Sequence, residues 1–147
     1  MNAEIQYKIL KPGDDSLLTR VAPDVFDHPV DPQLAGEFLR DPRHHIAVAI
    51  DQDVVVGFAS AIHYIHPDKP AELWVNEVGV APTHQRQGIG KAILRLLFAH
   101  GHLLGCKSAW VLTERANEPA IGLYRACGGE EPQDETVMFS FELGDIK

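Results

Sequence analysis

The pattern of hydrophobic and polar residues predicts antiparallel strands in the first half of the chain. Apolar runs at residues 46–50 and 54–65 are rich in β-branched side chains, and the polar turn Asp51-Gln52-Asp53 between them is typical of a hairpin. Residues 5–10 form a shorter strand-like run that ends at a Lys-Pro-Gly-Asp turn, and residues 72–80 form another. The first half is therefore expected to build most of a sheet.

Two helices are predicted from apolar residues that recur with helical period. The first begins at Asp31-Pro32 and ends near Asp41-Pro42, with three apolar residues on one side: Leu34, Phe38 and Leu39. The second follows Gly88, and its apolar residues share one face: Ile89, Ile93, Leu96, Leu97 and Leu104. Gly105 stands where a left-handed residue ends a helix. Gly101 lies inside this helix at a cost of about 1 kcal/mol relative to alanine, so we expect a loose last turn.

The remaining sequence predicts a strand, a short helix and a closing strand. Residues 109–112 are strand-like, Asn117 can cap a helix that ends at Gly128-Gly129, and residues 137–141 form the last strand. The strands at 72–80 and 109–112 flank the long helix as a β–α–β unit, whose crossover should be right-handed. The expected fold class is mixed α/β, in one domain over residues 1–147, with helices on both faces of a mixed sheet.

Composition and charge restrict the class of partner. The 147 residues are 45% hydrophobic and 23% charged, which is typical of an ordinary globular domain. Acidic residues outnumber basic ones by 21 to 13, and the net charge of −8 argues against nucleic acid. It favours a cationic ligand, or reflects solubility alone. No apolar run could cross a membrane and no signal peptide is visible. With only two cysteines, we expect a reduced, cytoplasmic protein.

A glycine-containing loop, Gln85-Arg86-Gln87-Gly88-Ile89-Gly90, lies between a predicted strand and the long helix, where backbone N–H groups can bind phosphate. It is not a Walker A loop, because Ala92 follows Gly90-Lys91. It is not a dinucleotide-binding fingerprint either, because Ile93 stands where the third glycine is required. The loop is then either an anion-binding turn, to which Arg86 adds charge, or a plain strand-to-helix connection.

Three segments in this order resemble the GCN5-related N-acetyltransferase (GNAT) superfamily. They are V-N-E-V-G-V at 75–80, Q-R-Q-G-I-G at 85–90 and N-E-P-A-I-G-L-Y-R-A-C-G at 117–128. Gly129 departs from the family, since many members have an aromatic residue there. The resemblance implies acetyl-CoA as the cofactor and the GNAT fold, a mostly antiparallel sheet of about six or seven strands whose β–α–β unit binds the coenzyme.

A narrower resemblance points to a substrate. E-L-W-V-N-E-V-G-V at 72–80, HxRQGI at 84–89, E-P-A at 118–120 and V-M-F at 137–139 are similar to GNAT-type aminoglycoside 3-N-acetyltransferases. This implies acetylation of the 3-amino group of an aminoglycoside, a small cationic amine, and hence antibiotic resistance. Alternatives are a polyamine, another small amine or a peptide N-terminus as acceptor, or a non-catalytic module that binds acetyl-CoA. Dimers are common in the family, which favours a homodimer.

Acetyl transfer to an amine requires a base and an acid. Glu77 matches an acidic position of the resembled enzymes and is the candidate base; the alternative is a solvated strand carboxylate. Glu72 would face the other side of a regular strand, unless a bulge turns both carboxylates to one side. Tyr124 occupies the family's position for the general acid and holds its proton at neutral pH. Its alternative role is a packed core aromatic.

The resemblance and the positions of the loops imply the remaining site residues. Those expected to bind the coenzyme follow the strand, the loop and the short helix: Val78, Gly79, Val80, Gln85, Arg86, Gln87, Gly88, Ile89, Gly90, Lys91, Asn117 and Tyr124. Those expected to bind the cationic substrate are acidic: Glu72, Glu77, Glu118, Asp27 and Glu135. The histidines are interpreted as surface or core residues, so no metal site is expected: His44, His45, His63, His66, His100 and His102.

Overall fold

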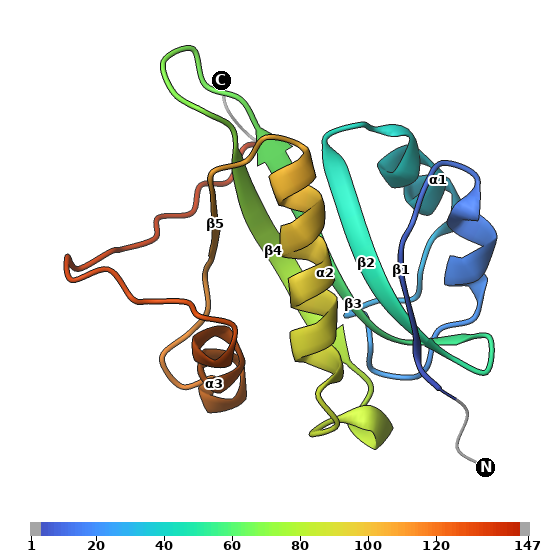
Figure 1. Cartoon of the computed structure of the whole chain (residues 1–147). Helices are drawn as coiled ribbons and strands as arrows, with labels where there is room; N and C mark the ends of the chain where they lie inside the picture. The colour runs from blue at the N-terminus through green and yellow to red at the C-terminus, as the bar shows by residue number, and fades with distance from the viewer. Residues whose placement is uncertain (1–3, 145–147) are drawn as a thin grey trace.

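One twisted sheet forms the centre of the computed structural model, which describes residues 4–144 (Figure 1). Its five strands lie side by side in chain order: β1 (Gln6–Ile9), β2 (His44–Asp51), β3 (Val54–Tyr64), β4 (Glu72–Val80) and β5 (Ser108–Val111). The first four pair antiparallel, whereas β5 runs parallel to β4. The mixed α/β fold is therefore confirmed.

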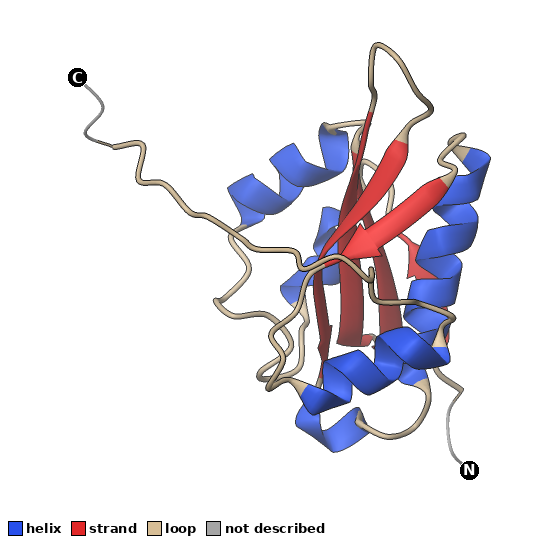
Figure 2. Ribbon diagram, turned by 90° about the vertical axis from the view of Figure 1, so that its left-hand side faces the viewer, coloured by secondary structure: helices blue, strands red, loops and turns tan. Residues whose placement is uncertain are grey.

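Helices cover both faces of this sheet (Figures 1 and 2). The long helix α2 (Ile89–Leu103) crosses one face, and the other carries α1 (Pro32–Arg40) and the 3-10 helix η1 (Asp14–Thr19). A short 3-10 turn, η2 (Pro82–His84), links β4 to α2, and α3 (Glu118–Ala126) follows β5. The β4–α2–β5 connection is the predicted β–α–β unit.

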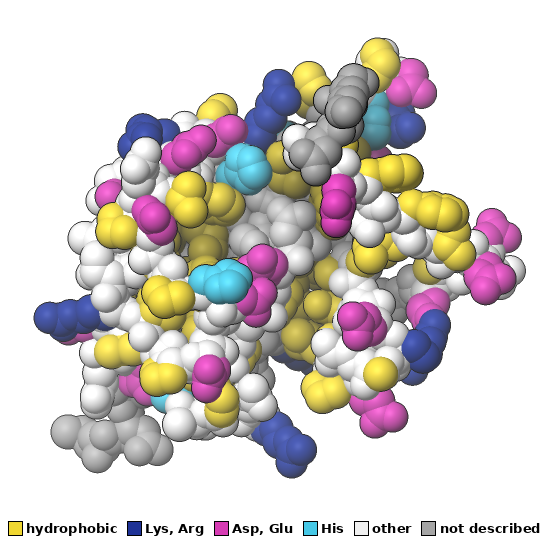
Figure 3. All heavy atoms as spheres, turned by 180° about the vertical axis from the view of Figure 1, so that it is seen from behind, with side chains coloured by type: hydrophobic (Ala, Val, Ile, Leu, Met, Phe, Trp, Pro, Cys, Tyr) yellow, Lys and Arg dark blue, Asp and Glu magenta, His cyan; other side chains and the backbone are white. Residues whose placement is uncertain are grey.

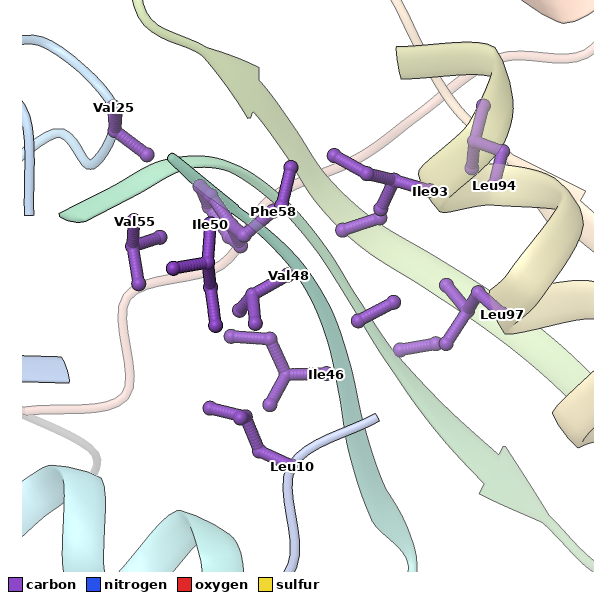
Figure 4. Close-up of a cluster of buried hydrophobic side chains, with 14 of the residues drawn as sticks. Leu10, Val25, Ile46, Val48, Ile50, Val55, Phe58, Ile93, Leu94 and Leu97 are labelled. Carbon is purple, nitrogen blue, oxygen red and sulfur yellow. The ribbon is translucent and has the colours of Figure 1, made fainter. Parts of the chain in front are cut away.

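The two faces of β2 and β3 differ in side-chain size. Toward α2 the strands present small, fully buried residues: Ala47, Ala49, Ala59 and Ala61. Gly57 belongs to this strip, because a Cβ there would lie 3.0 Å from Cδ1 of Ile93. On the opposite face Phe58 stacks on Phe26, with ring centroids 3.9 Å apart. Figure 4 shows the core on both sides of the strands, with the side chains of α2 on one side. The small residues let α2 approach closely, and the large ones fill the space under α1.

The C-terminal end of α2 is well formed, so the predicted loose last turn is wrong. Gly105 has φ +90° and ends the helix, as predicted, and the N–H of Cys106 donates to the carbonyl of Gly101 over 3.0 Å. Gly101 is buried because the helix crosses β4 closely there; a Cβ would lie 3.0 Å from Cδ2 of Leu73. Close packing outweighs the intrinsic helical cost of glycine.

The buried side of α1 differs from the predicted one at Leu34. Asp31 caps the helix as expected, since its Oδ1 accepts hydrogen bonds from the N–H groups of Gln33 and Leu34 over 2.8 and 3.2 Å. Leu34 itself is 63% exposed, so its predicted burial is wrong. Leu39 is buried and Phe38 packs against the core, as predicted, and Ala35, four residues before Leu39 and therefore on the same helix face, is buried instead of Leu34.

The predicted closing strand at residues 137–141 is not formed, and the described residues contain five strands instead of six or seven. Residues 129–144 leave α3 along an irregular path past the edge of β5 (Figure 2). Four apolar side chains of this tail are 66–81% exposed: Val137, Met138, Phe139 and Phe141. Alternating apolar residues make a strand only where a neighbouring edge accepts their backbone hydrogen bonds, and no such pairing exists among the described residues.

Three histidines form a chain of contacts between the sheet and α2. Nε2 of His45 lies 2.7 Å from Nδ1 of His63, and Nδ1 of His45 lies 3.2 Å from Nε2 of His100. Burial, and then the proximity of His100 and His63, lower the pKa of His45 from 6.5 to about 4. The carboxylate of Asp41 opposes this shift. His45 is therefore a neutral core residue at neutral pH.

This lowered pKa predicts that acid destabilises the fold. Unfolded chains bind a proton at His45 below pH 6.5 that the folded protein does not bind until about pH 4. The free energy of unfolding should fall by about 2 kcal/mol between about pH 7 and pH 5. Urea unfolding at a series of pH values measures this slope. His45→Gln should flatten it, and His102→Gln, on the exposed side of α2, should not. An unchanged slope in His45→Gln would contradict the assignment.

Candidate functional site

A bulge in β4 brings the two predicted carboxylates to one face of the sheet. Ser60 of β3 pairs with Glu77, but the next residue along β3, Ala61, pairs with Val75. Asn76 is therefore the extra residue, and the alternation of side chains shifts by one position there. Before the bulge Tyr64 pairs with Glu72. Because Ser60 and Tyr64 lie four residues apart on a regular strand, Glu72 and Glu77 both face away from α2.

Half of β4 has a free edge. Its pairing with β5 spans only residues 72–75 of β4 and 108–111 of β5. From Asn76 to Val80, β4 bonds to β3 on one side, and among residues 4–144 no strand lies on the other. At this end of the sheet, Figure 1 shows α3 beside the beginning of α2. An extended ligand could pair with the N–H and C=O groups of this edge, as another strand would.

The loop before α2 is exposed and has the conformation of an anion-binding turn. Arg86 and Gly88 have φ of +64° and +78°, and Gly88 is the N-terminal cap of α2. No side chain caps this helix end, so the first N–H groups of α2 are available to an anion. The predicted loop residues Gln85, Arg86, Gln87 and Gly88 are all exposed. The side chain of Ile89 is buried in the core, so only its backbone can contact a ligand.

Two contacts hold the loop against the sheet. Nε2 of His84 lies 2.7 Å from Oδ2 of Asp51 in the β2–β3 hairpin, and Nδ1 lies 2.8 Å from Oγ1 of Thr83. The side-chain amide of Gln85 donates to the carbonyl of Val80 over 3.1 Å, which ties the loop to the end of β4. His84 therefore has a positioning role that the sequence did not reveal.

The second glycine of the loop lets α3 approach α2. A Cβ on Gly90 would lie 3.2 Å from Cδ2 of Leu123, the residue before Tyr124. Tyr124 is half-buried, and burial raises the pKa of its hydroxyl, which therefore stays protonated at neutral pH. Asn117 caps α3: its Oδ1 accepts from the N–H of Ala120 over 3.2 Å. Gly79 likewise serves packing, because a Cβ there would lie 2.3 Å from the carbonyl oxygen of Val25.

The end of α3 explains the unusual glycine pair. Gly128 has φ +91°, and the N–H groups of Gly128 and Gly129 donate to the carbonyls of Arg125 and Tyr124, both over 2.9 Å. A Cβ on Gly129 would lie 2.9 Å from the carbonyl oxygen of Tyr124. The sequence therefore ends α3 in a tight glycine turn, where an aromatic residue would not fit this geometry.

The predicted acidic residues do not form one cluster. Glu72 and Glu77 share the face opposite α2, where Figure 3 shows a hollow with acidic side chains around it. Asp27 lines a hollow of about 640 Å³ formed by η1, the loop that follows it and the start of α1. Glu118 lies exposed on the first turn of α3, and Glu135 lies exposed in the tail. Only Glu72 and Glu77 are brought together by the sheet.

The described residues contain neither a metal-binding cluster nor a membrane-spanning helix. Within residues 4–144, no three His, Cys, Asp or Glu side chains are grouped so that they could hold a metal ion. None of the helices described between these residues is both long and apolar enough to span a bilayer.

The family of this chain follows from its similarity to known proteins. The model of the "Acetyltransferase (GNAT) family" matches residues 15–128. The chain belongs to the GNAT family. This family uses acetyl-CoA. That coenzyme fits these features. The free edge of β4 can pair with its pantetheine amides, and the exposed loop with the uncapped start of α2 can bind its pyrophosphate.

Relatives within the family differ in substrate. The chain is 32% identical over 106 residues to the N-alpha-acetyltransferase RimI of Mycobacterium tuberculosis, covering 71% of this chain and 63% of that protein. An aminoglycoside acetyltransferase from an uncultured soil metagenomic sample, solved with sisomicin, has a TM-score of 0.79 at 19% identity, with 95% and 96% coverage. Aminoglycoside N-acetyltransferase AAC(6′)-Iy, solved with CoA, has a TM-score of 0.78 at 20% identity, with 97% of both chains covered. The similarity to these structures shows the fold.

The role of Gly88 can be tested by binding. Gly88→Ala adds a Cβ with no atom within 4 Å, so its effect is confined to the left-handed backbone, at a cost of about 1 kcal/mol. The loop should relax and CoA affinity should fall by about five- to tenfold, as measured by calorimetric titration. Gly122→Ala in α3 also adds a Cβ in open space, but in ordinary helix, and should bind CoA like the wild type. Unchanged affinity in Gly88→Ala would contradict the assignment of the loop.

Proposed function

We propose that this chain is an acetyl-CoA-dependent N-acetyltransferase of a small polycation, and that its acceptor is the 3-amino group of an aminoglycoside. The observation that carries this proposal is the bulge in β4. It turns Glu77 and Glu72 to the open face of the sheet, beside the strand edge and helix end that suit the coenzyme. A cationic acceptor and the acetyl donor would then meet at β4.

The residues on this strand and on α3 suit the chemistry. Bound acetyl-CoA supplies an acetyl group on a thioester. Glu77 accepts, directly or through water, the proton that an ammonium group must lose before its nitrogen can attack the acetyl carbon. The hydroxyl of Tyr124 would donate its proton to the leaving thiolate, and the second proton that the nitrogen loses on forming the amide would return to Tyr124 through solvent. Burial keeps that hydroxyl protonated until it is needed.

Charge favours a polycationic acceptor over a neutral amine. The chain has a net charge of −8, and the face that carries Glu77 has a hollow with acidic side chains, histidines and apolar side chains at its rim (Figure 3). Such a surface attracts a ligand with several ammonium groups and raises its rate of association. The soil metagenomic acetyltransferase of the same fold was solved with the aminoglycoside sisomicin, which supports this substrate class. RimI, an N-alpha-acetyltransferase, supports a peptide N-terminus as the second candidate.

A panel of amines tests the acceptor. Purified protein should release free thiol from acetyl-CoA with gentamicin, and the acetylated product should carry the acetyl group on the 3-amine, as identified by NMR. Spermidine and peptides with free N-termini should react slowly. Faster turnover with peptides would favour the second candidate. Binding of acetyl-CoA with no thiol release for any amine would indicate a non-catalytic module.

The role of Glu77 can be separated from coenzyme binding. Glu77→Gln keeps the size of the side chain but removes its basicity, so the turnover number should fall by about 100-fold or more. Part of this loss should be recovered at alkaline pH, where more of the acceptor amine is already neutral. CoA affinity should be unchanged. Glu37→Gln, which alters an exposed carboxylate on α1, is the matched control and should retain full turnover. Full activity of Glu77→Gln would exclude it as the base.

A further inference from the structure

Two tryptophans form an exposed aromatic surface on the same face as Glu77. Trp74 of β4 and Trp110 of β5 are paired neighbours, and their rings stack with centroids 4.9 Å apart and planes inclined by 11°. They are 38% and 36% exposed. Trp74 faces away from α2, because Leu73, the residue before it, packs under that helix. We call this pair the tryptophan platform.

Hydrogen bonds hold the platform beside a carboxylate. The indole N–H of Trp110 donates to the hydroxyl of Tyr64 over 2.6 Å, and that hydroxyl donates to Oε2 of Glu72 over 3.3 Å. His66 and Ser108 also contact the carboxylate of Glu72, at 2.6 and 3.2 Å. These contacts lower the pKa of Glu72, and the contact with His66 has the largest effect. A fixed aromatic surface thus lies next to a carboxylate that is ionised at neutral pH.

This combination favours a charged ring over a purely apolar partner. The faces of indole rings attract cations and pack against the C–H groups of a flat ring, and tryptophan gives the strongest such interaction among aromatic residues. The neighbouring carboxylate is held by Tyr64, His66 and Ser108, so it keeps a fixed negative charge beside the rings that an apolar partner would leave unused. An ammonium group beside Glu72 supplies the counter-charge.

The spacing along β4 relates the platform to the reacting amine. Trp74 pairs with Ile62 of β3 and Glu77 pairs with Ser60, two positions further along, which corresponds to about 7 Å. The bulge between them keeps both on the same face. A ligand whose amine lies at Glu77 therefore reaches the platform with a part of the molecule about one sugar ring away.

We propose that Trp74 and Trp110 form an acceptor subsite that binds a second, ammonium-bearing sugar ring about 7 Å from the acetylated amine. This inference rests on the proposed function for the position of the reacting amine. It adds a requirement on the acceptor, which must carry a charged ring. A linear polyamine and a peptide N-terminus have positive charge but no such ring.

The chain contains two tryptophans in total, so its intrinsic tryptophan fluorescence reports on this platform alone. Gentamicin, added without coenzyme, should change the emission in a saturable way. Trehalose, a neutral disaccharide, should cause no change at the same concentrations, and spermidine should require at least about tenfold more ligand. An equal response to trehalose, or no response to gentamicin, would overturn the proposal. An emission maximum that shifts with protein concentration but not with gentamicin would also overturn it, because a second copy of the chain would then cover the platform.

Kinetics of a variant give an independent measurement. Trp110→Leu should raise the KM for gentamicin by about tenfold or more, and leave kcat and the KM for acetyl-CoA within about twofold. Tyr7→Leu, which removes a 39% exposed aromatic from β1, is the matched control and should change neither KM. Trp110→Phe retains a ring and should fall between Trp110→Leu and the wild type. Because the fluorescence titration uses the wild-type protein, it decides the question even if Trp110→Leu fails to fold.

The two proposals fail in different ways. If gentamicin is acetylated while its KM is unchanged in Trp110→Leu and the emission stays constant, the subsite is wrong and the proposed function stands. If no amine is acetylated but gentamicin changes the emission saturably, the subsite stands and the proposed function is wrong.

Discussion

The arrangement of this site depends on the unequal pairing of β4. On one side β4 bonds to β3 along its whole length, and on the other it bonds to β5 over only four residue pairs. The second half of β4 is thus held rigidly by β3 while its other edge stays free. A ligand at that edge gains backbone hydrogen bonds from a strand that needs no reorganisation to make them.

Close packing holds the other two parts of the site relative to this edge. The small residues of β2 and β3 allow α2 to lie close to the sheet, so the uncapped start of α2 is fixed beside the end of β4. Gly90 then lets Leu123 bring α3 against the first turn of α2. His84 binds the connecting turn to the β2–β3 hairpin. Each contact requires a small residue or a single polar pair, which makes the geometry sensitive to single substitutions.

The two sides of the sheet separate two tasks. The face under α2 is apolar, apart from the histidine chain at its end, and it stabilises the fold. The opposite face carries Glu72, Glu77 and the tryptophan platform, and is open near β4 and β5. The bulge at Asn76 makes this separation complete, because a regular strand would have turned one of the two carboxylates into the apolar layer under α2.

The sequence by itself determined five strands, the α-helices and the caps at Asp31, Asn117 and Gly105, since these depend on short-range periodicity and local hydrogen bonds. The family was indicated by the resemblance of three short segments. It wrongly placed Leu34 on the buried side of α1 and predicted a strand at 137–141, because burial and strand pairing depend on distant neighbours. Tertiary structure alone decided that Glu72 shares a face with Glu77 and that Trp74 meets Trp110. Both follow from the register between strands, and in that register Trp74 pairs with a residue 36 positions away in the chain.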